Sequence, residues 1–223
     1  LPTVRLGDAD SSDIGNWVID MACRTVGGWH LTGMSKLKVA VNLSAQQLEQ
    51  AELLPLIERS LARHGLPASM LELELTETVA AIDSTAIGLL FQRFRSLGVS
   101  LSIDDFGTGF SSLSYLKNLS FDKLKIDREF VTDVDTRRDC QAICSSIIAL
   151  GSGLGIDVLA EGVERFEEFA WLRRHGCNLF QGYYFSRPLP GADFLSFIKD
   201  RAAVEQLVTP SRQPVPAHQR IAS

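Results

Sequence analysis

The sequence predicts an α/β protein built around one parallel β-sheet. Short apolar runs alternate with longer amphipathic stretches along almost the whole chain. A repeating β–α order of this kind is typical of parallel strands joined by right-handed helical crossovers. A chain of 223 residues suits one large domain. The pattern leaves two architectures open, an open doubly wound sheet and a (β/α)8 barrel.

The apolar runs predict six strands. The segment LELEL at Leu71–Leu75 alternates with the period of two that a strand requires. The six predicted strands are Lys38–Asn42, Leu71–Leu75, Val99–Ile103, Lys123–Ile126, Ile156–Ala160 and Asn178–Phe180. Six strands are two fewer than a barrel needs, and the first predicted element is a helix. We therefore expect any missing strands to lie before Leu1.

The amphipathic stretches predict seven helices. Glycine and proline mark where several of them stop, as Gly65 and Pro67 do for the second helix and Gly98 for the third. The predicted helices are Ile14–Trp29, Leu53–His64, Ser84–Leu97, Ser112–Asn118, Arg138–Leu154, Glu164–His175 and Gly191–Leu207. The last residues are rich in proline and lack periodicity, so we expect residues 1–207 to form one domain and 208–223 a disordered tail.

Charge, hydropathy and cysteine content indicate which partners and which cellular location suit this protein. The net charge of −5 and the pI near 5.4 argue against duplex nucleic acid as a partner. No apolar stretch approaches the ~20 residues that span a membrane, and the first residues do not resemble a signal peptide. The four cysteines form no CxxC pair, so we interpret them as reduced packing residues of a cytoplasmic protein, with a metal or redox role as the alternative.

Polar side chains stand at the end of one predicted strand after another. In a barrel all strand carboxyl ends open onto the same face, so these side chains would converge there. A single strand-terminal aspartate or asparagine is more often a helix cap or turn residue, but capping does not explain six strands that all end this way. The residues in question are Asn42, Glu74, Glu77, Asp104, Asp105, Lys125, Asp127, Glu161 and Gln181.

Carboxylates gathered in this way repel one another unless a cation lies among them. Lys125 alone cannot neutralise them. Oxygen ligands without cysteine or histidine favour Mg²⁺, Mn²⁺ or Ca²⁺ over zinc. The adjacent aspartates Asp104 and Asp105 suit a pair of ions ~3.5–4 Å apart, the arrangement used for displacement at a phosphoester. The residues themselves therefore predict a metal-assisted phosphodiesterase-like site.

Six segments, taken in order, resemble the successive motifs of the EAL domain family. They are VNLSAQQL (41–48), ELTE (74–77), DDFGTGFSSLSYL (104–116), KID (125–127), AEGVE (160–164) and QGYYFSRP (181–188). EAL domains are bacterial cyclic di-GMP phosphodiesterases on a modified TIM (β/α)8 barrel. The resemblance implies hydrolysis of cyclic di-GMP to linear pGpG by a two-metal site, with the first strands of the barrel absent from this chain.

The resemblance also implies a role for each matching residue. Lys125 would hold and polarise the attacking water, and Glu161 would complete the surroundings of the second metal ion. Two Mg²⁺ or Mn²⁺ ions are expected, with Ca²⁺ inhibiting. The implied metal ligands are Asn42, Glu74, Asp104, Asp105 and Glu161, and the implied catalytic residues are Lys125, Glu161 and Glu77.

The same resemblance assigns a nucleotide-binding set and a loop. Gln181 would orient the nucleotide or a water, Asp127 would support the site, and Arg187 would contact a phosphate or base. The implied ligand-binding residues are Asp127, Gln181, Phe185, Ser186, Arg187 and Pro188. Glu77 would brace a loop that couples the metal site to a dimer interface. This loop consists of Phe106, Gly107, Thr108, Gly109, Phe110, Ser111 and Ser112.

One family motif is missing from the 223 residues. The Glu-Ala-Leu tripeptide, whose glutamate ligates a metal ion in the family, does not occur. We expect it on a strand upstream of Leu1 in an intact protein, which would also carry a sensor or GGDEF domain, form a homodimer, and be cytoplasmic or anchored to a membrane through upstream segments. The alternative is a degenerate EAL domain that binds cyclic di-GMP as a receptor, or serves as a protein-interaction module.

Overall fold

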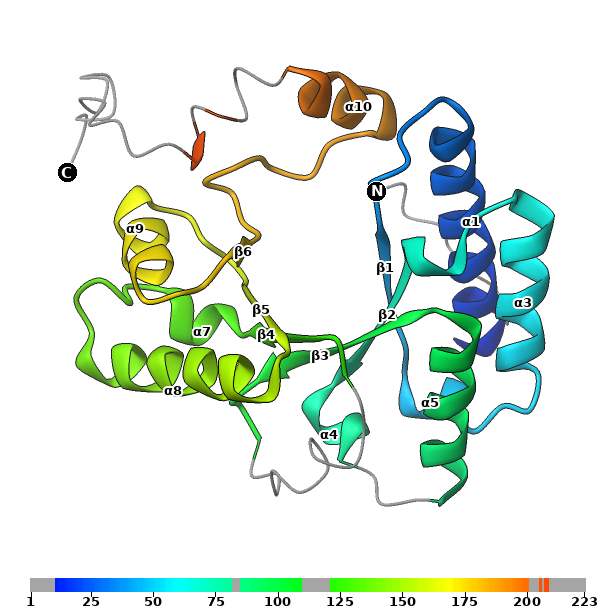
Figure 1. Cartoon of the computed structure of the whole chain (residues 1–223), viewed down its shortest axis with the longest axis horizontal. Helices are drawn as coiled ribbons and strands as arrows, with labels where there is room; N and C mark the ends of the chain where they lie inside the picture. Colours follow the sequence, from blue (N-terminus) through cyan, green and yellow to red (C-terminus); the bar gives the residue numbers. More distant parts are fainter. Residues whose placement is uncertain (1–10, 82–84, 110–120, 201–204, 206, 209–223) are drawn as a thin grey trace.

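The computed structural model describes residues 11–81, 85–109, 121–200, 205, 207 and 208, and its centre is a curled parallel sheet (Figure 1). Six strands follow one another across the sheet in chain order, each parallel to the next. They are β1 (Val39–Asn42), β2 (Leu71–Thr76), β3 (Ser100–Phe106), β4 (Lys123–Ile126), β5 (Asp157–Ala160) and β6 (Leu179–Phe180). All six match predicted strands.

The sequential strand order distinguishes the two predicted architectures. A doubly wound sheet reverses its strand order and carries helices on both faces. Here the order β1 to β6 never reverses, and Figure 1 shows the long helices on the outside of the curl. The described part of the chain is therefore a partial (β/α)8 barrel, in which β1 and β6 each pair with one strand only.

The two faces of the sheet differ sharply in polarity. Side chains that point outward, toward the helices, are apolar and fully buried, for example Leu73, Ile103 and Leu124. Side chains that alternate with them point into the curl and are charged or polar, for example Glu74 and Lys125, which are also buried. The usual barrel interior is filled with branched apolar side chains. The inner face of this sheet carries charged side chains instead, and these side chains form the site described below.

Five long helices cover the outer face. They are α1 (Ser11–Leu31), α3 (Leu53–His64), α5 (Thr85–Leu97), α8 (Arg138–Leu154) and α9 (Phe166–Arg174). Helices α3 and α8 each end at a glycine in the left-handed conformation, Gly65 with φ 60° and Gly155 with φ 68°. The predicted helices in these regions are confirmed, with bounds that differ by a few residues. All four cysteines are free and buried, as packing residues should be.

Short helical turns follow the strand ends, and the sequence did not reveal them. They are α2 (Ala45–Leu48), α4 (Glu77–Ala80) and α7 (Arg128–Val131), with a 3-10 turn η1 (Ala68–Met70) before β2. Four residues are too few to show helical periodicity. Capping side chains explain two of them, because Ser44 and Asp127 accept backbone N–H groups at the starts of α2 and α7.

The last helix corrects a prediction. Helix α10 (Gly191–Lys199) ends before Asp200, which has a non-helical ψ of 78°, although Glu205, Leu207 and Val208 are again helical. A carboxylate at a helix carboxyl end opposes the helix dipole, and aspartate is a weak helix former. Trp29 of α1 stacks on Phe194 of α10 with ring centroids 5.6 Å apart. The predicted helix at 112–118 and the tail after residue 208 lie outside the described residues. No described helix is long and apolar enough to cross a membrane.

Candidate metal and nucleotide site

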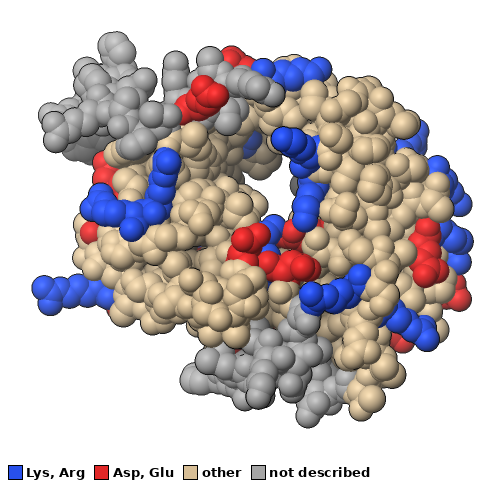
Figure 2. All heavy atoms as spheres, in the orientation of Figure 1, with Lys and Arg blue, Asp and Glu red and all other residues tan. Residues whose placement is uncertain are grey.

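The charged residues of the inner face meet at the carboxyl ends of the central strands. Glu74 lies near the end of β2, Asp104 near the end of β3, Lys125 near the end of β4, and Glu161 directly after β5. Figure 2 shows acidic side chains gathered beside the hollow in the middle of the molecule. Four different strands therefore contribute one functional group each to the same place.

The Lys125 ammonium lies at the centre of this cluster. Its Nζ is 3.0 Å from Glu74 Oε1, 3.0 Å from Asp104 Oδ1 and 2.7 Å from Glu161 Oε1. Only 4% of Lys125 is exposed, so solvent screens these ion pairs little. Burial alone would lower the pKa of Lys125, but the hydrogen bonds to Glu161 and Glu74 and their charges together raise it. Lys125 is therefore firmly protonated.

One lysine does not balance the acids around it. Burial raises the pKa of Glu74 and of Glu161, and it outweighs the opposing effect of Lys125 on both. Burial is also the largest cause that raises the pKa of Asp105, followed by the charge of Asp104 and a hydrogen bond with Asp127. These carboxylates would be stabilised by more positive charge than the described residues supply.

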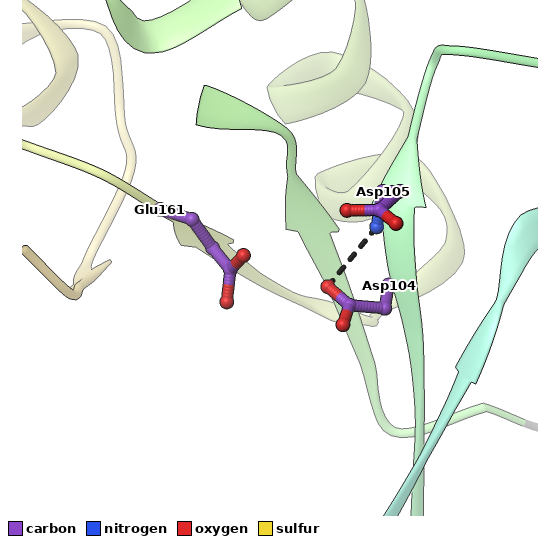
Figure 3. Close-up of side chains that lie close together, drawn as sticks. All are labelled: Asp104, Asp105 and Glu161. Atoms are coloured by element: carbon purple, nitrogen blue, oxygen red, sulfur yellow. Dashed lines mark hydrogen bonds between the residues drawn. The ribbon is translucent and has the colours of Figure 1, made fainter. Parts of the chain in front are cut away.

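Asp104 and Asp105 point their carboxylates toward Glu161 across the end of the sheet (Figure 3). One carboxylate oxygen from each of the three residues lies within 4.8 Å of the others. The Asp105 N–H donates a 3.0 Å hydrogen bond to Asp104 Oδ1. Oxygen donors this close, half-buried and short of positive charge, fit a hard divalent cation.

The backbone of Asp105 makes this arrangement possible. Its φ is 53°, in the left-handed region that aspartate tolerates better than most residues. The register between β3 and β4 shifts between Ile103 and Phe106, so the aspartate pair sits in an irregularity of the sheet. The irregularity brings both adjacent carboxylates to the same side, whereas a regular strand would send them to opposite faces.

Asn42 and Gln181 flank the cluster. Asn42 ends β1 and lies in register with Glu74 of the neighbouring strand, with its side chain exposed. Gln181 follows β6, and its N–H donates to the Ala160 carbonyl at 2.9 Å. Gly182 then passes so close to the backbone of Val163 that a Cβ there would lie 2.1 Å from the Val163 carbonyl oxygen. Among the described contacts, neither side chain takes part in the Lys125 ion pairs.

Glu77 lies apart from the ion pairs and holds the loop after β3. Its buried carboxylate accepts the N–H groups of Gly107, at 2.9 Å, and of Gly109, at 3.4 Å. A Cβ on Gly109 would come within 3.1 Å of Glu77 Oε1, so a larger residue would crowd this contact. Thr108 Oγ1 donates to the Asp105 carbonyl at 2.8 Å. The structure thus ties the loop to the aspartate pair, while Phe110, Ser111 and Ser112 lie outside the described residues.

Asp127 and the segment 185–188 surround the cluster in different ways. Asp127 Oδ1 caps α7 by accepting the Glu129 N–H at 2.6 Å. Phe185 is half-buried, with its ring 5.6 Å from that of Phe169, so it helps to pack the end of the barrel. Arg187 stacks its guanidinium 4.9 Å from the centroid of the Tyr183 ring.

The other two residues of this segment differ in exposure, because Ser186 is half-buried and Pro188 is exposed. Ser186 Oγ donates to the Arg187 carbonyl at 2.8 Å. The segment follows β6, so it leaves the same end of the sheet that carries the cluster.

Sequence reasoning passed over a second buried ion pair, Glu72 with Lys123. Lys123 Nζ lies 2.7 Å from both carboxylate oxygens of Glu72. The signal was present in the sequence. The alternation in LELEL places Glu72 on the same face as Glu74, and the alternation in KLK places Lys123 on the same face as Lys125.

The fold and the cluster define a partial (β/α)8 barrel with an oxygen-rich cation site at the carboxyl ends of its strands. Comparison with known proteins is consistent with this class. The model of the EAL domain family matches residues 9–188. The chain belongs to the EAL domain family.

Relatives and solved structures of this family cover most of the chain. Cyclic di-GMP phosphodiesterase NbdA of Pseudomonas aeruginosa is 45% identical over 186 residues, which are 83% of this chain and 24% of NbdA. The structure of the PaMucR phosphodiesterase in complex with c-di-GMP is 43% identical with a TM-score of 0.78, over 82% of this chain and 74% of that one.

Structures with metal ions are also among the matches. Klebsiella pneumoniae BlrP1, solved as a manganese/cy-diGMP complex, is 33% identical with a TM-score of 0.76, over 83% of this chain and 47% of that one. BlrP1 was also solved as a calcium/cy-diGMP complex. This chain spans about a quarter of the length of curated relatives such as NbdA and MucR.

Proposed function

We propose that the protein carrying this chain hydrolyses cyclic di-GMP to linear pGpG, as a step in bacterial second-messenger signalling. The observation that carries this proposal is the cluster of Asp104, Asp105 and Glu161, with carboxylate oxygens within 4.8 Å of one another. Membership of the EAL domain family supports the substrate, because NbdA is a cyclic di-GMP phosphodiesterase and PaMucR was solved with c-di-GMP.

The proposed cofactor is a pair of Mg²⁺ or Mn²⁺ ions. Such ions would polarise the scissile phosphodiester and lower the pKa of water. Ca²⁺ should inhibit, because its larger size and flexible coordination do not hold reactants in one geometry. The residues proposed to hold the ions are Asn42, Glu74, Asp104, Asp105 and Glu161.

The chain's other residues have distinct proposed tasks. Lys125, firmly protonated among three carboxylates, would donate a hydrogen bond to the attacking water and align it with the phosphorus. Asp127 would support the Asp105 carboxylate, and Gln181 would orient the nucleotide. Arg187 would bind a phosphate or a base, and its stacking on Tyr183 would hold the guanidinium in place.

A direct assay tests this proposal. The full natural protein that carries the chain is incubated with cyclic di-GMP and Mn²⁺, and pGpG is measured by chromatography. We expect turnover that EDTA abolishes and that Glu74→Gln reduces by at least about 10³-fold. Folded wild-type protein that leaves cyclic di-GMP intact with either Mn²⁺ or Mg²⁺ would overturn the proposal.

The second candidate is binding without hydrolysis. Relatives solved with c-di-GMP bound support recognition of the nucleotide, which a receptor would share with an enzyme. Tight cyclic di-GMP binding with no pGpG would support a receptor. A partner interaction that survives Glu74→Ala with Asp104→Ala, in a protein that binds no nucleotide, would instead indicate a protein-interaction module.

The wider setting forms part of the same proposal. Residues 1–207 would act as the EAL domain of a longer protein, with a sensor or GGDEF domain upstream. The domain would form a homodimer through the loop 106–112, which Glu77 braces from the side of the cluster. The free cysteines favour the cytoplasm as its location.

A further inference from the structure

The Glu72–Lys123 ion pair forms a second charged layer inside the curl of the sheet. Glu72 lies on β2 and Lys123 on β4, each two residues before its counterpart in the Glu74–Lys125 pair. Lys123 contacts both Glu72 carboxylate oxygens at 2.7 Å, and the Glu72 side chain is only 5% exposed. The Glu74–Lys125 pair thus repeats the Glu72–Lys123 pair two residues further along both strands.

Both pairs reach across a strand. β2 and β4 each hydrogen-bond to β3 and not to one another, so a bond between Glu72 and Lys123 spans the inner face of β3. The residue of β3 in register with Lys123 is Ser102, which is fully buried and has no partner for its hydroxyl among the described residues. A small side chain at this position leaves room for the bridge, and its hydroxyl keeps the layer polar.

The bridge lies directly before the point where the regular pairing of β3 with β4 ends. Paired residues of β3 and β4 continue up to Ile103 with Leu124, and the register then shifts until Phe106 pairs with Ile126. Asp104 and Asp105 sit in that shift, so regular pairing does not fix the height of Lys125 against β3. Among the described residues, the Glu72–Lys123 bridge links β4 to β2 on the side of the site that precedes the shift.

We propose that Glu72 and Lys123 are positioning residues for the cluster above them. The bridge fixes β4 against β2 across the last regularly paired residues of β3, directly before the irregular part that carries Asp104 and Asp105, and so sets the distance between Lys125 and Glu74. Neither residue belongs to the set proposed to hold the nucleotide or the metal ions. This inference rests on the proposed metal site, and it assigns a role to a layer that the family motifs do not include.

The test removes the bridge without leaving a buried charge. The double variant Glu72→Met with Lys123→Met keeps the volume and loses both charges, a change that folded proteins tolerate well. Lys123→Arg preserves the bridge and serves as the conservative control. Ile126→Val, on the outer face of β4, is the control for a small loss of packing.

Two readouts separate positioning from general destabilisation. Mn²⁺ affinity is measured by calorimetry without nucleotide, and kcat and KM for cyclic di-GMP are measured separately in the full natural protein. We expect the double variant to bind Mn²⁺ about 10–100-fold more weakly and to lose kcat by a similar factor, with KM within about twofold. Lys123→Arg, which keeps the bridge, should show only a small part of either loss. Ile126→Val should show neither loss.

The possible results test the positioning role and the proposed function separately. Unchanged Mn²⁺ affinity and kcat in the folded double variant would overturn the positioning role, as would equal losses in Ile126→Val at the same Tm. Should the double variant not fold, Glu72→Gln takes its place with the same readouts. A wild type that binds Mn²⁺ but leaves cyclic di-GMP intact would overturn the proposed function alone, and one that binds no Mn²⁺ would overturn both.

Discussion

Asp105 combines two unfavourable features at one residue. Its backbone has a φ of 53°, and its carboxyl group is partly buried beside Asp104 and Asp127. Strained backbone and crowded charge persist only where the surrounding structure requires them, and both concentrate at functional sites. The left-handed backbone requires a residue that tolerates positive φ, and the chemistry requires a carboxylate. Substitutions that change only one of these properties can therefore separate the two features.

Asp105→Asn should remove the chemistry and keep the backbone. Asparagine also tolerates the left-handed region, so we expect turnover to fall by at least about 10²–10³-fold while Tm in EDTA stays equal or rises. Asp105→Ala should lose turnover equally and also lose about 1–2 kcal/mol of unfolding free energy. Turnover assays and thermal melts measure both. A large Tm loss in Asp105→Asn would contradict this account.

Lys125 forms ion pairs with three carboxylates at once, and its removal should lower stability strongly. In Lys125→Met we expect the free energy of unfolding in EDTA to fall by about 3–5 kcal/mol, because buried carboxylates lose their cation. Chemical denaturation measures the loss, and Lys36→Met, an exposed lysine, is the control. Adding Glu74→Gln to Lys125→Met should restore part of the stability. An unchanged midpoint in the single variant would show that the acids are already protonated.

The sequence predicted the residues of the cluster because strand ends are easy to locate. Polar residues that follow buried runs mark the end of each strand, and parallel strands bring those ends together. The sequence could not predict that Lys125 pairs with Glu74, Asp104 and Glu161 together, since this depends on the curl of the sheet. Nor could it predict the left-handed backbone of Asp105, which only the local register shift requires.

At the scale of elements, short turns join the sheet to the site. The four-residue helix α4 begins at Glu77, directly after β2, and this places the Glu77 carboxylate under the loop that follows β3. Long helices were predictable because their apolar faces repeat over several turns. The short ones were not, and neither was the end of α10, where Asp200 leaves the helical conformation without a glycine or proline to mark it.

Glu77→Ala should loosen the loop that the carboxylate holds. The N–H groups of Gly107 and Gly109 lose their acceptor, so we expect faster amide exchange there and turnover lower by about 10–100-fold. Glu77→Gln keeps an amide oxygen as acceptor and should lose much less. Thr76→Ala is the matched control, because Thr76 is exposed and makes no side-chain cap. Equal exchange rates at 107 and 109 in all three variants would contradict the bracing role.

At the scale of the whole molecule, the polarity of the barrel is inverted. Apolar side chains face outward beneath the helices, and charges face inward around the hollow shown in Figure 2. The alternation of strands and helices predicted a parallel sheet and the number of its described strands, whereas the strand order, which distinguishes a barrel from a doubly wound sheet, came from the structure. The buried inner charges store an electrostatic cost that bound cations would relieve, so the stability of the whole molecule should depend on metal and pH together.

The sign of this dependence follows from the raised pKa values of Glu74, Asp105 and Glu161. A carboxyl group whose folded pKa exceeds its unfolded value stabilises the fold below the unfolded pKa. That contribution is lost as pH rises through the folded pKa. In EDTA these three groups should therefore lower stability as pH rises above about 4–4.5.

Mn²⁺ should reverse that loss, and more strongly at higher pH. Cations compete with protons for the same oxygens, so we expect the Tm difference between Mn²⁺ and EDTA to be larger at pH 8 than at pH 5. Thermal melts at fixed ionic strength measure it. Glu161→Gln should shrink the difference, whereas Asp139→Asn should not, because Asp139 is an exposed residue of α8 whose pKa is lowered by its hydrogen bond with Arg137. A Tm difference that is equal at both pH values would mean that Mn²⁺ does not bind through these three carboxylates.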